Sequence, residues 1–427
     1  MTYNYKSSFL QKLSTRGFLY QCTHDQEMDN LFAEGPQKLY IGFDATADSL
    51  HVGSLLPLMV LRWAHLCGHE VILLLGGGTT LVGDPSGKEE TRTILTKEII
   101  CTYTKGIKES VGKLLPMQDD RVRVLNNADW LASLNYLDFL RDIGSLFSVN
   151  KMLALESVKT RLDRAQNLSF LEFNYMLCQA YDFFVLSDQQ GCMIQGGGSD
   201  QWGNIVSGVD LIRRKSGKQA YGLTFPLIET RDGVKMGKTA GGAVWLHPEK
   251  KSAYDYWQYW RNVDDREIER FLLLFTCLDE ETISDIVKGD PNKAKIRLAD
   301  EATSLLRGEE VLGAIHETVA ALSQEKAPYT VTTTPEGFPV VNTDLPLYKV
   351  NRSFLEQDSL LMNLLIEAGA IESKSAVRRL IRDGALSLDG EKIQDELYQI
   401  SLKDLIDPFV IHIKIGKKKN LLLQVLP

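Results

Sequence analysis

The chain has 427 residues, more than one hydrophobic core usually organises, which predicts two or three domains. No long uninterrupted apolar run and no apolar signal segment occur, so we expect a cytoplasmic protein without a membrane partner. The net charge of −8 argues against nucleic-acid binding over the whole surface, and no DNA partner is expected.

Residues 1–245 alternate short apolar runs with longer helical patterns. Candidate strands lie at residues 39–43, 71–75, 122–125, 192–195 and 223–228. Residues 55–66 predict an apolar helix that tolerates Pro57 because this proline falls in the first turn. This alternation is typical of parallel strands connected by helices. We therefore predict an α/β catalytic domain with a Rossmann-like, doubly wound parallel sheet.

The rest of the chain divides into three segments. Residues 246–325 have apolar side chains at helical spacing, such as Ile268, Phe271 and Phe275, and predict an α-helical domain. Residues 326–357 contain four prolines and few charges, and predict a linker or an extended connection. Residues 358–427 predict a small α+β domain, in which a basic helix precedes a glycine turn and a short hairpin.

The first chemical motif runs from the strand at residues 39–43 into the helix at residues 55–66. A helix entered there directs unpaired backbone N–H groups and the positive end of its dipole toward an anion. Glycines in the motif let a flat ligand approach the backbone, and hydroxyl and imidazole donors suit phosphate oxygens. The candidate ligand-binding residues of this motif are Gly42, Asp44, Thr46, His51, Gly53 and Ser54.

The second motif, Lys235-Met-Gly-Lys238-Thr239, follows the last predicted strand. Two lysines around a glycine suit a mobile loop that closes over a polyphosphate. Each motif alone is a weak signal. Together, with a parallel-sheet pattern between them, they resemble the paired signatures of class I aminoacyl-tRNA synthetases.

Residues 76–88, with Arg92, indicate which of the class I synthetases this chain resembles. They match neither the Walker pattern, because Glu89 follows Lys88, nor the dinucleotide pattern, because Leu81 stands where a glycine or alanine is needed. They closely resemble the corresponding segment of tyrosyl-tRNA synthetases, as do residues 173–183 and 195–204. The resemblance extends from about residue 10 to the C-terminus, in the bacterial and organellar arrangement.

Tyr175, Gln179 and Asp182 stand four and three residues apart, so a helix would direct all three side chains into one pocket. The resemblance implies two sets of ligands for L-tyrosine: Asp84, Tyr175 and Gln179 for the α-amino group, with Gln201 nearby in the tyrosine site, and Tyr40 and Asp182 for the phenolic hydroxyl. Phenylalanine would leave the second set unpaired. Leaving these buried groups without a hydrogen-bond partner lowers the affinity for phenylalanine. This enzyme family is itself a documented example of that penalty, with discrimination of roughly 10⁵ between tyrosine and phenylalanine, so no editing domain is expected.

For ATP, the resemblance implies that Gly198 and Asp200 bind the ribose and that Gly42 and Asp44 lie at the adenylate and α-phosphate. It also implies a catalytic clamp on the pyrophosphate, formed by Thr46, His51, Lys88, Arg92, Lys235, Lys238 and Thr239. Ser54 is a departure, because many class I enzymes have a second histidine there. Serine donates a hydrogen bond but carries no charge, which leaves the contribution of Ser54 less certain than that of His51.

Mg²⁺ is expected to accompany ATP as substrate, with no carboxylate cage to hold the metal independently. No zinc is expected, because the six cysteines contain no CxxC pair. His65 and His69 have a helical spacing of four, but they lack the glutamate of a zinc protease motif and are interpreted as structural.

The C-terminal segment resembles a small RNA-binding domain named after a ribosomal protein of the small subunit. Its candidate RNA contacts are Lys374, Arg378, Arg379, Arg382, Lys417 and Lys418. By this likeness the domain binds the variable arm of tRNA(Tyr), and the helical domain binds the anticodon stem.

The motifs and the resemblance together predict a tyrosine–tRNA ligase. The carboxylate of tyrosine attacks the α-phosphorus of ATP to give tyrosyl-adenylate and pyrophosphate, and the tyrosyl group passes to the 3′ end of tRNA(Tyr). Two alternatives are an inactive synthetase-like RNA-binding protein, which the intact site argues against, and a tryptophan-specific relative, which Tyr40 and Asp182 argue against. The resemblance also implies a homodimer, with residues 126–144 as candidates for the contact.

Overall fold

The computed structural model describes residues 4–86, 95–229, 236–239, 242–324, 328–333, 339–400, 410–416 and 419–426. The chain forms two compact units. The first comprises Met1–Lys250 and Val263–Leu306, and the second comprises Lys251–Asn262 and Arg307–Pro427. The four predicted segments stay a prediction.

A six-stranded sheet, in the order β1-β6-β5-β2-β3-β4, forms the centre of the first unit. Its strands are β1 (Gln21–Cys22), β2 (Lys38–Asp44), β3 (Glu70–Gly76), β4 (Val122–Asn126), β5 (Ile194–Gly198) and β6 (Tyr221–Phe225). Neighbouring strands from β4 to β6 are parallel, and β1 pairs antiparallel with β6. The predicted doubly wound α/β fold is confirmed.

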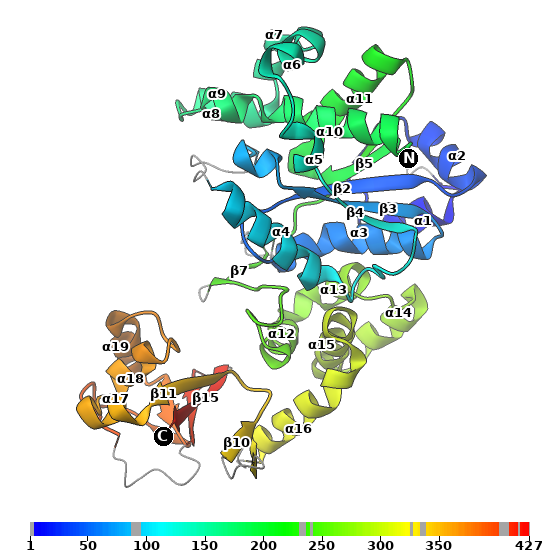
Figure 1. Ribbon diagram of the computed structural model, residues 1–427. Helices are drawn as coiled ribbons and strands as arrows, with labels where there is room; N and C mark the ends of the chain where they lie inside the picture. The colour runs from blue at the N-terminus through cyan, green and yellow to red at the C-terminus, as the bar shows by residue number, and fades with distance from the viewer. Residues whose placement is uncertain are drawn as a thin grey trace. The chain divides into compact units, whose positions relative to one another are not determined.

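Four long helices cover this sheet. Helices α10 (Tyr175–Gln189) and α11 (Trp202–Ser216) lie on one face, and α3 (Leu55–Leu66) and α4 (Lys97–Val111) lie on the other (Figure 1). The strand order runs outward from β2 to β4 in one direction and from β5 to β6 in the other. Because such crossovers are right-handed, this reversal places their helices on opposite faces and leaves a crevice at the carboxyl ends of β2 and β5.

Two of the five predicted strands differ from their predicted bounds by more than one residue. Strand β5 continues through Gly196, Gly197 and Gly198, which the sequence pattern left outside the strand. Strand β6 ends at Phe225, because Pro226 has no N–H to donate to a neighbouring strand.

The remaining elements of the first unit are mainly short helices. They are α1 (Ser8–Thr15), α2 (Asp25–Glu34), α5 (Ala128–Leu131), α6 (Tyr136–Asp142), α7 (Val149–Leu153), α8 (Glu156–Asp163), α9 (Phe170–Phe173), α13 (Ile268–Phe275), α14 (Glu280–Lys288) and α15 (Pro291–Arg307), the 3-10 turns η1 (Val52–Ser54), η2 (Thr79–Leu81), η3 (Gly144–Leu146), η4 (Ser199–Gln201) and η5 (Asp265–Glu267), and the short strands β7 (Lys238–Thr239) and β8 (Gly242–Ala243).

The buried Arg16 joins the N-terminal helix α1 to α13. Its guanidinium donates to the carbonyls of Leu272 and Leu273, at 3.3 and 2.7 Å, and to those of Thr276 and Leu278, at 2.8 and 2.7 Å. Because the last carbonyls of a helix have no partner within it, a buried cation there satisfies them.

The second unit contains α12 (Ala253–Arg261), η6 (Glu309–Val311), α16 (Leu312–Ser323), α17 (Arg352–Gln357), α18 (Leu361–Glu367) and α19 (Lys374–Arg382). A hairpin joins β9 (Thr330–Thr333) to β10 (Pro339–Asn342). A five-stranded sheet has the order β11-β15-β14-β12-β13, from β11 (Leu347–Asn351), β12 (Leu386–Leu388), β13 (Glu391–Lys392), β14 (Val410–Ile415) and β15 (Lys419–Leu426). Three strands and α17 thus lie within the segment predicted as a linker, and β11 pairs with β15 in parallel.

His65 and His69 do not share a helix face, which corrects the predicted spacing. Helix α3 ends at Leu66. The Nε2 atom of His65 lies 2.8 Å from an oxygen of Asp119, whereas His69 packs against Phe9 and Phe32, where burial lowers its pKa to about 4.

Within the described part of the chain, no helix has the length and apolar character to cross a membrane.

Candidate active site

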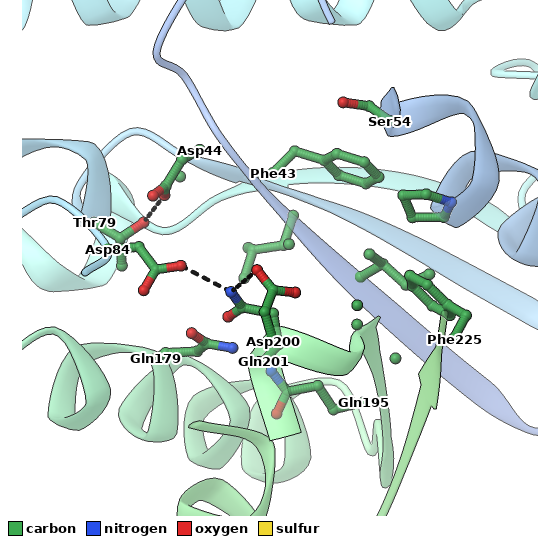
Figure 2. Close-up of a pocket in the computed structure, with 18 of the residues that line it drawn as sticks. Phe43, Asp44, Ser54, Thr79, Asp84, Gln179, Gln195, Asp200, Gln201 and Phe225 are labelled. Carbon is green, nitrogen blue, oxygen red and sulfur yellow. Dashed lines mark hydrogen bonds between the residues drawn. The ribbon is translucent and has the colours of Figure 1, made fainter. Parts of the chain in front are cut away.

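A cavity of about 380 Å³ opens at the carboxyl ends of β2 and β5, the position that a doubly wound sheet favours for a ligand (Figure 2). The structure brings together there every predicted tyrosine-binding residue and most of the predicted ATP-binding ones. These residues are Tyr40, Gly42, Asp44, Thr46, His51, Gly53, Ser54, Asp84, Tyr175, Gln179, Asp182, Gly198, Asp200 and Gln201.

Other predicted site residues cannot be placed in the cavity. Lys88, Arg92, Lys235, Lys417 and Lys418 lie outside the described residues. Lys238 and Thr239 form β7, whose backbone alone is described. The predicted RNA contacts Lys374, Arg378, Arg379 and Arg382 all lie on α19 in the second unit.

Asp182 lies at one end of the cavity, where it is 2% exposed. One carboxylate oxygen accepts a hydrogen bond from Asn127 Nδ2 at 2.8 Å, and the other accepts one from Trp130 Nε1 at 2.7 Å. Burial raises the pKa of Asp182 to about 7, although these two donors act in the opposite direction. Each oxygen keeps a free lone pair, so the carboxylate can accept a further hydrogen bond from a ligand.

Two more polar atoms at this end lack partners. Tyr40 Oη and Gln195 Oε1 are buried and, among the residues that the structure describes, neither forms a hydrogen bond. Burial also raises the pKa of Tyr40 well above its usual value, so its hydroxyl stays protonated. A buried polar atom without a partner is costly, which makes the Tyr40 hydroxyl suited to a polar group of a bound ligand, whereas Gln195 Oε1 faces Gly208 of α11.

Asn127 is a residue that the sequence reasoning missed. Its Oδ1 accepts from the backbone N–H of Gly78 at 2.7 Å, and its Nδ2 donates to Thr79 and to Asp182. The side chain therefore fixes the glycine loop after β3 and the carboxylate of Asp182 together. Its place two residues after the predicted parallel strand at residues 122–125 was a usable signal, because such positions meet at the ligand edge of the sheet.

The middle of the cavity is acidic. Tyr175 donates to Asp44 at 3.0 Å, and Thr79 donates to the other oxygen of Asp44 at 2.8 Å. Gln201 donates to Asp84 at 2.8 Å and, more weakly, to Asp200 at 3.4 Å, as Figure 2 shows. Described lining residues include four aspartates and no lysine or arginine, a composition that suits an ammonium group.

Asn204 is a second residue that the prediction missed. It donates to Gln179 Oε1 at 2.9 Å and to Gln201 Oε1 at 3.2 Å. These bonds determine the orientation of both amides, because each carbonyl oxygen must face Asn204 and each NH₂ group must point elsewhere.

At the other end of the cavity, the first motif pairs with the chain after the second. The N–H of Val52 donates to Val244 O at 2.9 Å, and that of Leu246 donates to Leu50 O at 2.8 Å. His51 Nδ1 accepts from the N–H of Gly53 at 3.0 Å. In the neutral ring the proton then lies on Nε2, which can donate to an anion.

Gly237 of the second motif lies against His51. Its φ of +98° is unfavourable for other residues, and a Cβ atom there would lie 2.7 Å from His51 Nδ1. The two motifs, far apart in the sequence, are therefore in direct contact.

Two family models match most of the chain. A model of the class I tRNA synthetases for tryptophan and tyrosine matches residues 33–324, and a model of a tyrosine–tRNA ligase C-terminal domain matches residues 340–423. A tyrosine–tRNA ligase of Pelagibacter ubique is 44% identical over 98% of this chain and 100% of its own length. One of Cereibacter sphaeroides is 45% identical over the whole of both chains.

Solved structures agree with these sequence matches. A C-terminally truncated mitochondrial tyrosyl-tRNA synthetase of Aspergillus nidulans superposes with a TM-score of 0.67 and 30% identity, over 74% of this chain and 94% of its own. A tryptophanyl-tRNA synthetase of Encephalitozoon cuniculi shares the fold at 11% identity, with a TM-score of 0.54 over 70% of this chain and 86% of its own.

Proposed function

We propose residue roles for a chain that belongs to the class I tRNA synthetase family for tryptophan and tyrosine, and within it to the tyrosine–tRNA ligases. Its reaction is the activation of L-tyrosine with ATP, followed by transfer of the tyrosyl group to tRNA(Tyr). The sequence prediction of this activity is confirmed. The roles of individual residues remain our proposal.

In this proposal, the phenolic hydroxyl of tyrosine donates to Asp182 and accepts from Tyr40. The observation that carries it is a buried carboxylate with two fixed N–H donors, beside a buried hydroxyl that has no hydrogen-bond partner among the residues that the structure describes. The α-amino group binds among Asp84, Tyr175 and Gln179, where the acidic lining favours a cation. Asp44, predicted at the nucleotide, also contributes negative charge here through its contact with Tyr175.

The nucleotide lies at the ends of β2 and β5. Gly42 and Gly198 allow the ATP to approach the backbone, and Asp200 binds the ribose hydroxyls. His51 donates from Nε2 to the phosphates, with Thr46, Gly53 and Ser54 beside it. Lys88, Arg92, Lys235, Lys238 and Thr239 complete the charge neutralisation of the pyrophosphate.

Mg²⁺ enters this proposal with ATP. The aspartates of the cavity already accept hydrogen bonds from neighbouring side chains, and within the described residues no group of three or more His, Cys, Asp or Glu is arranged to hold a metal. The phosphates would supply the ligands, and the metal would neutralise pyrophosphate charge. The proposal includes no zinc.

The two parts of the chain beyond the sheet are proposed to bind tRNA(Tyr). Helices of residues 246–325 contact the anticodon stem, and the C-terminal segment contacts the variable arm. Support for the second role is the exposed basic face of α19. Because free tyrosine, ATP and tRNA meet in the cytoplasm, we keep this location, with no membrane or DNA partner.

A homodimer is also part of the proposal, through residues 126–144 and the adjoining α9. Apolar side chains of this surface are exposed, and three of the four, Tyr136, Phe170 and Leu171, line a second, mainly apolar cavity of about 520 Å³. Such a patch on a globular protein marks an interaction site. The exposed residues are Tyr136, Leu137, Phe170 and Leu171.

Pyrophosphate exchange with tyrosine, phenylalanine and tryptophan tests the pocket. We expect exchange with tyrosine only in the unaltered protein. Asp182→Ala should lower kcat/KM for tyrosine by roughly 10²-fold or more and remove most of the selectivity against phenylalanine, because the phenol loses its charged acceptor.

Asp188→Ala is the matched control, since Asp188 is exposed on the same helix, and it should leave both values unchanged. Thermal unfolding of both variants separates loss of a contact from loss of the fold. Unchanged selectivity in Asp182→Ala would refute the proposed contact between Asp182 and the phenolic hydroxyl. Exchange with tryptophan instead of tyrosine would favour the tryptophan-specific alternative, and no exchange with any of the three would favour an inactive RNA-binding protein.

A further inference from the structure

The basic helix α19 is connected to an acidic turn of the same unit. Glu396 accepts a hydrogen bond from Arg382 Nε at 2.8 Å and lies 3.5 Å from Arg378 Nε. The two arginine side chains nevertheless remain 69% and 47% exposed. Because Glu396 contacts them through Nε, their terminal Nη donors remain accessible to an anionic partner.

Leu397, directly after this glutamate, is 71% exposed. The turn that carries it is well fixed. The N–H of Leu397 donates to Asp395 Oδ1 at 2.8 Å, and the carbonyl of Tyr398 accepts from the N–H of Leu361 at 2.9 Å. An isolated exposed leucine needs no explanation, but these bonds fix the backbone of this one directly beside Glu396, which contacts both arginines.

We propose that Leu397, Arg378 and Arg382 form one contact surface for folded RNA. Leu397 packs on the exposed face of an unpaired nucleobase, and the two guanidiniums bind the flanking phosphates. The inference rests on the proposed tRNA role of the C-terminal segment and adds the type of RNA feature that it recognises. Glu396 fixes the guanidiniums in place, which lowers the entropy cost of binding.

The chemistry of the surface favours RNA over an acidic protein. The chain as a whole has a net charge of −8, yet Lys374, Arg378, Arg379 and Arg382 are all exposed on one helix. Clustered arginines suit phosphates, and single-stranded loops and junctions of RNA present base faces that an apolar side chain can cover. A paired duplex offers phosphates without such a face.

The salt dependence of binding distinguishes the apolar contact of Leu397 with a base from the ionic contacts of the arginines with phosphates. The affinity of full-length protein for a tRNA(Tyr) transcript is measured over a series of salt concentrations. Leu397→Ser should weaken binding roughly five- to tenfold at every concentration and leave the slope of log K against log salt unchanged, because no charge is lost. Arg382→Ala should reduce that slope by about 1.

Val331→Ser is the matched control, an exposed apolar side chain of β9 in the same unit, and it should bind like the unaltered protein. On a fully paired RNA duplex, Leu397→Ser should have no effect. Unchanged affinity of Leu397→Ser for the transcript, or an equal loss on the duplex, would overturn the inference. Pyrophosphate exchange without tRNA tests the ligase proposal separately, because it can succeed while this surface proves irrelevant.

Discussion

At the scale of single residues, Asp182 shows how the fold alters a side chain that the sequence already marks. Its spacing from Tyr175 and Gln179 places it on the pocket face of a helix, and the structure has all three on α10. What the spacing does not contain is the pair of donors, Asn127 and Trp130, which come from a different part of the chain. Only tertiary packing brings them to the carboxylate.

The raised pKa of Asp182 predicts a dependence of stability on pH. Between about pH 4 and about pH 7 the folded protein keeps a proton that the unfolded chain releases. The free energy of unfolding should therefore decrease as pH rises through this window, by at most about 1.4 kcal/mol per pH unit from this group, and level off above it.

Urea unfolding at several pH values measures this contribution as a difference between proteins. Asp182→Ala should lack the decrease, whereas Asp188→Ala, altered on the exposed face of α10, should keep it. Parallel curves for the unaltered protein and Asp182→Ala would show that Asp182 is already ionised below neutrality.

At the scale of elements, the differences from prediction have local physical causes. Glycines are poor strand formers, so Gly196, Gly197 and Gly198 were left out of β5, yet a strand beside a ligand site gains space from their lack of side chains. Pro226 shortens β6. The contact between the first and second motifs could not be predicted, since it depends on pairing between distant segments.

Gly237 is a sensitive point of that contact, because it combines a positive φ with close packing against His51. Gly237→Ala would place a Cβ atom 2.7 Å from His51 Nδ1 and 3.0 Å from Gly53 N, in a backbone conformation that alanine disfavours. The displaced imidazole should lower the rate of tyrosyl-adenylate formation by roughly 10- to 100-fold, with little change in tyrosine affinity, because misplacement by about an ångström has this effect.

Rapid-quench measurement of adenylate formation tests this expectation. Gly217→Ala provides the comparison, since Gly217 also has a positive φ, +69°, but no other atom of the described residues lies within 4 Å of the added Cβ. That variant should lose about 1 kcal/mol of stability from backbone strain and keep its rate. Equal rate losses in the two variants would show that backbone strain, and not displacement of His51, lowers the rate of adenylate formation.

At the scale of the whole molecule, the sequence pattern does not contain the contacts between segments that lie far apart along the chain. Proline and threonine between residues 326 and 357 indicated an extended connection, and strands do occur there. However, β11 pairs with β15, near the end of the chain, and α12 groups with the second unit. Pairings between such distant residues leave no periodic signal in either segment.

The proposed homodimer is the remaining property of the whole molecule. Leu137 is 72% exposed on α6, beside the apolar cavity that Leu134, Phe139 and Leu140 help to line. If a second copy covers this surface, a carboxylate at Leu137 would be buried without a partner, which is strongly unfavourable. Leu137→Asp should therefore raise the dimer dissociation constant by roughly 100-fold or more.

Sedimentation equilibrium over a range of protein concentrations measures that constant. Leu66→Asp is the matched control, because Leu66 is also largely exposed but lies at the end of α3, and it should leave the dimer intact. A dimer that persists in Leu137→Asp would move the interface elsewhere on the molecule. A monomer in the unaltered protein at micromolar concentration would refute dimerisation itself, while the ligase chemistry of the single chain would stand on its own assays.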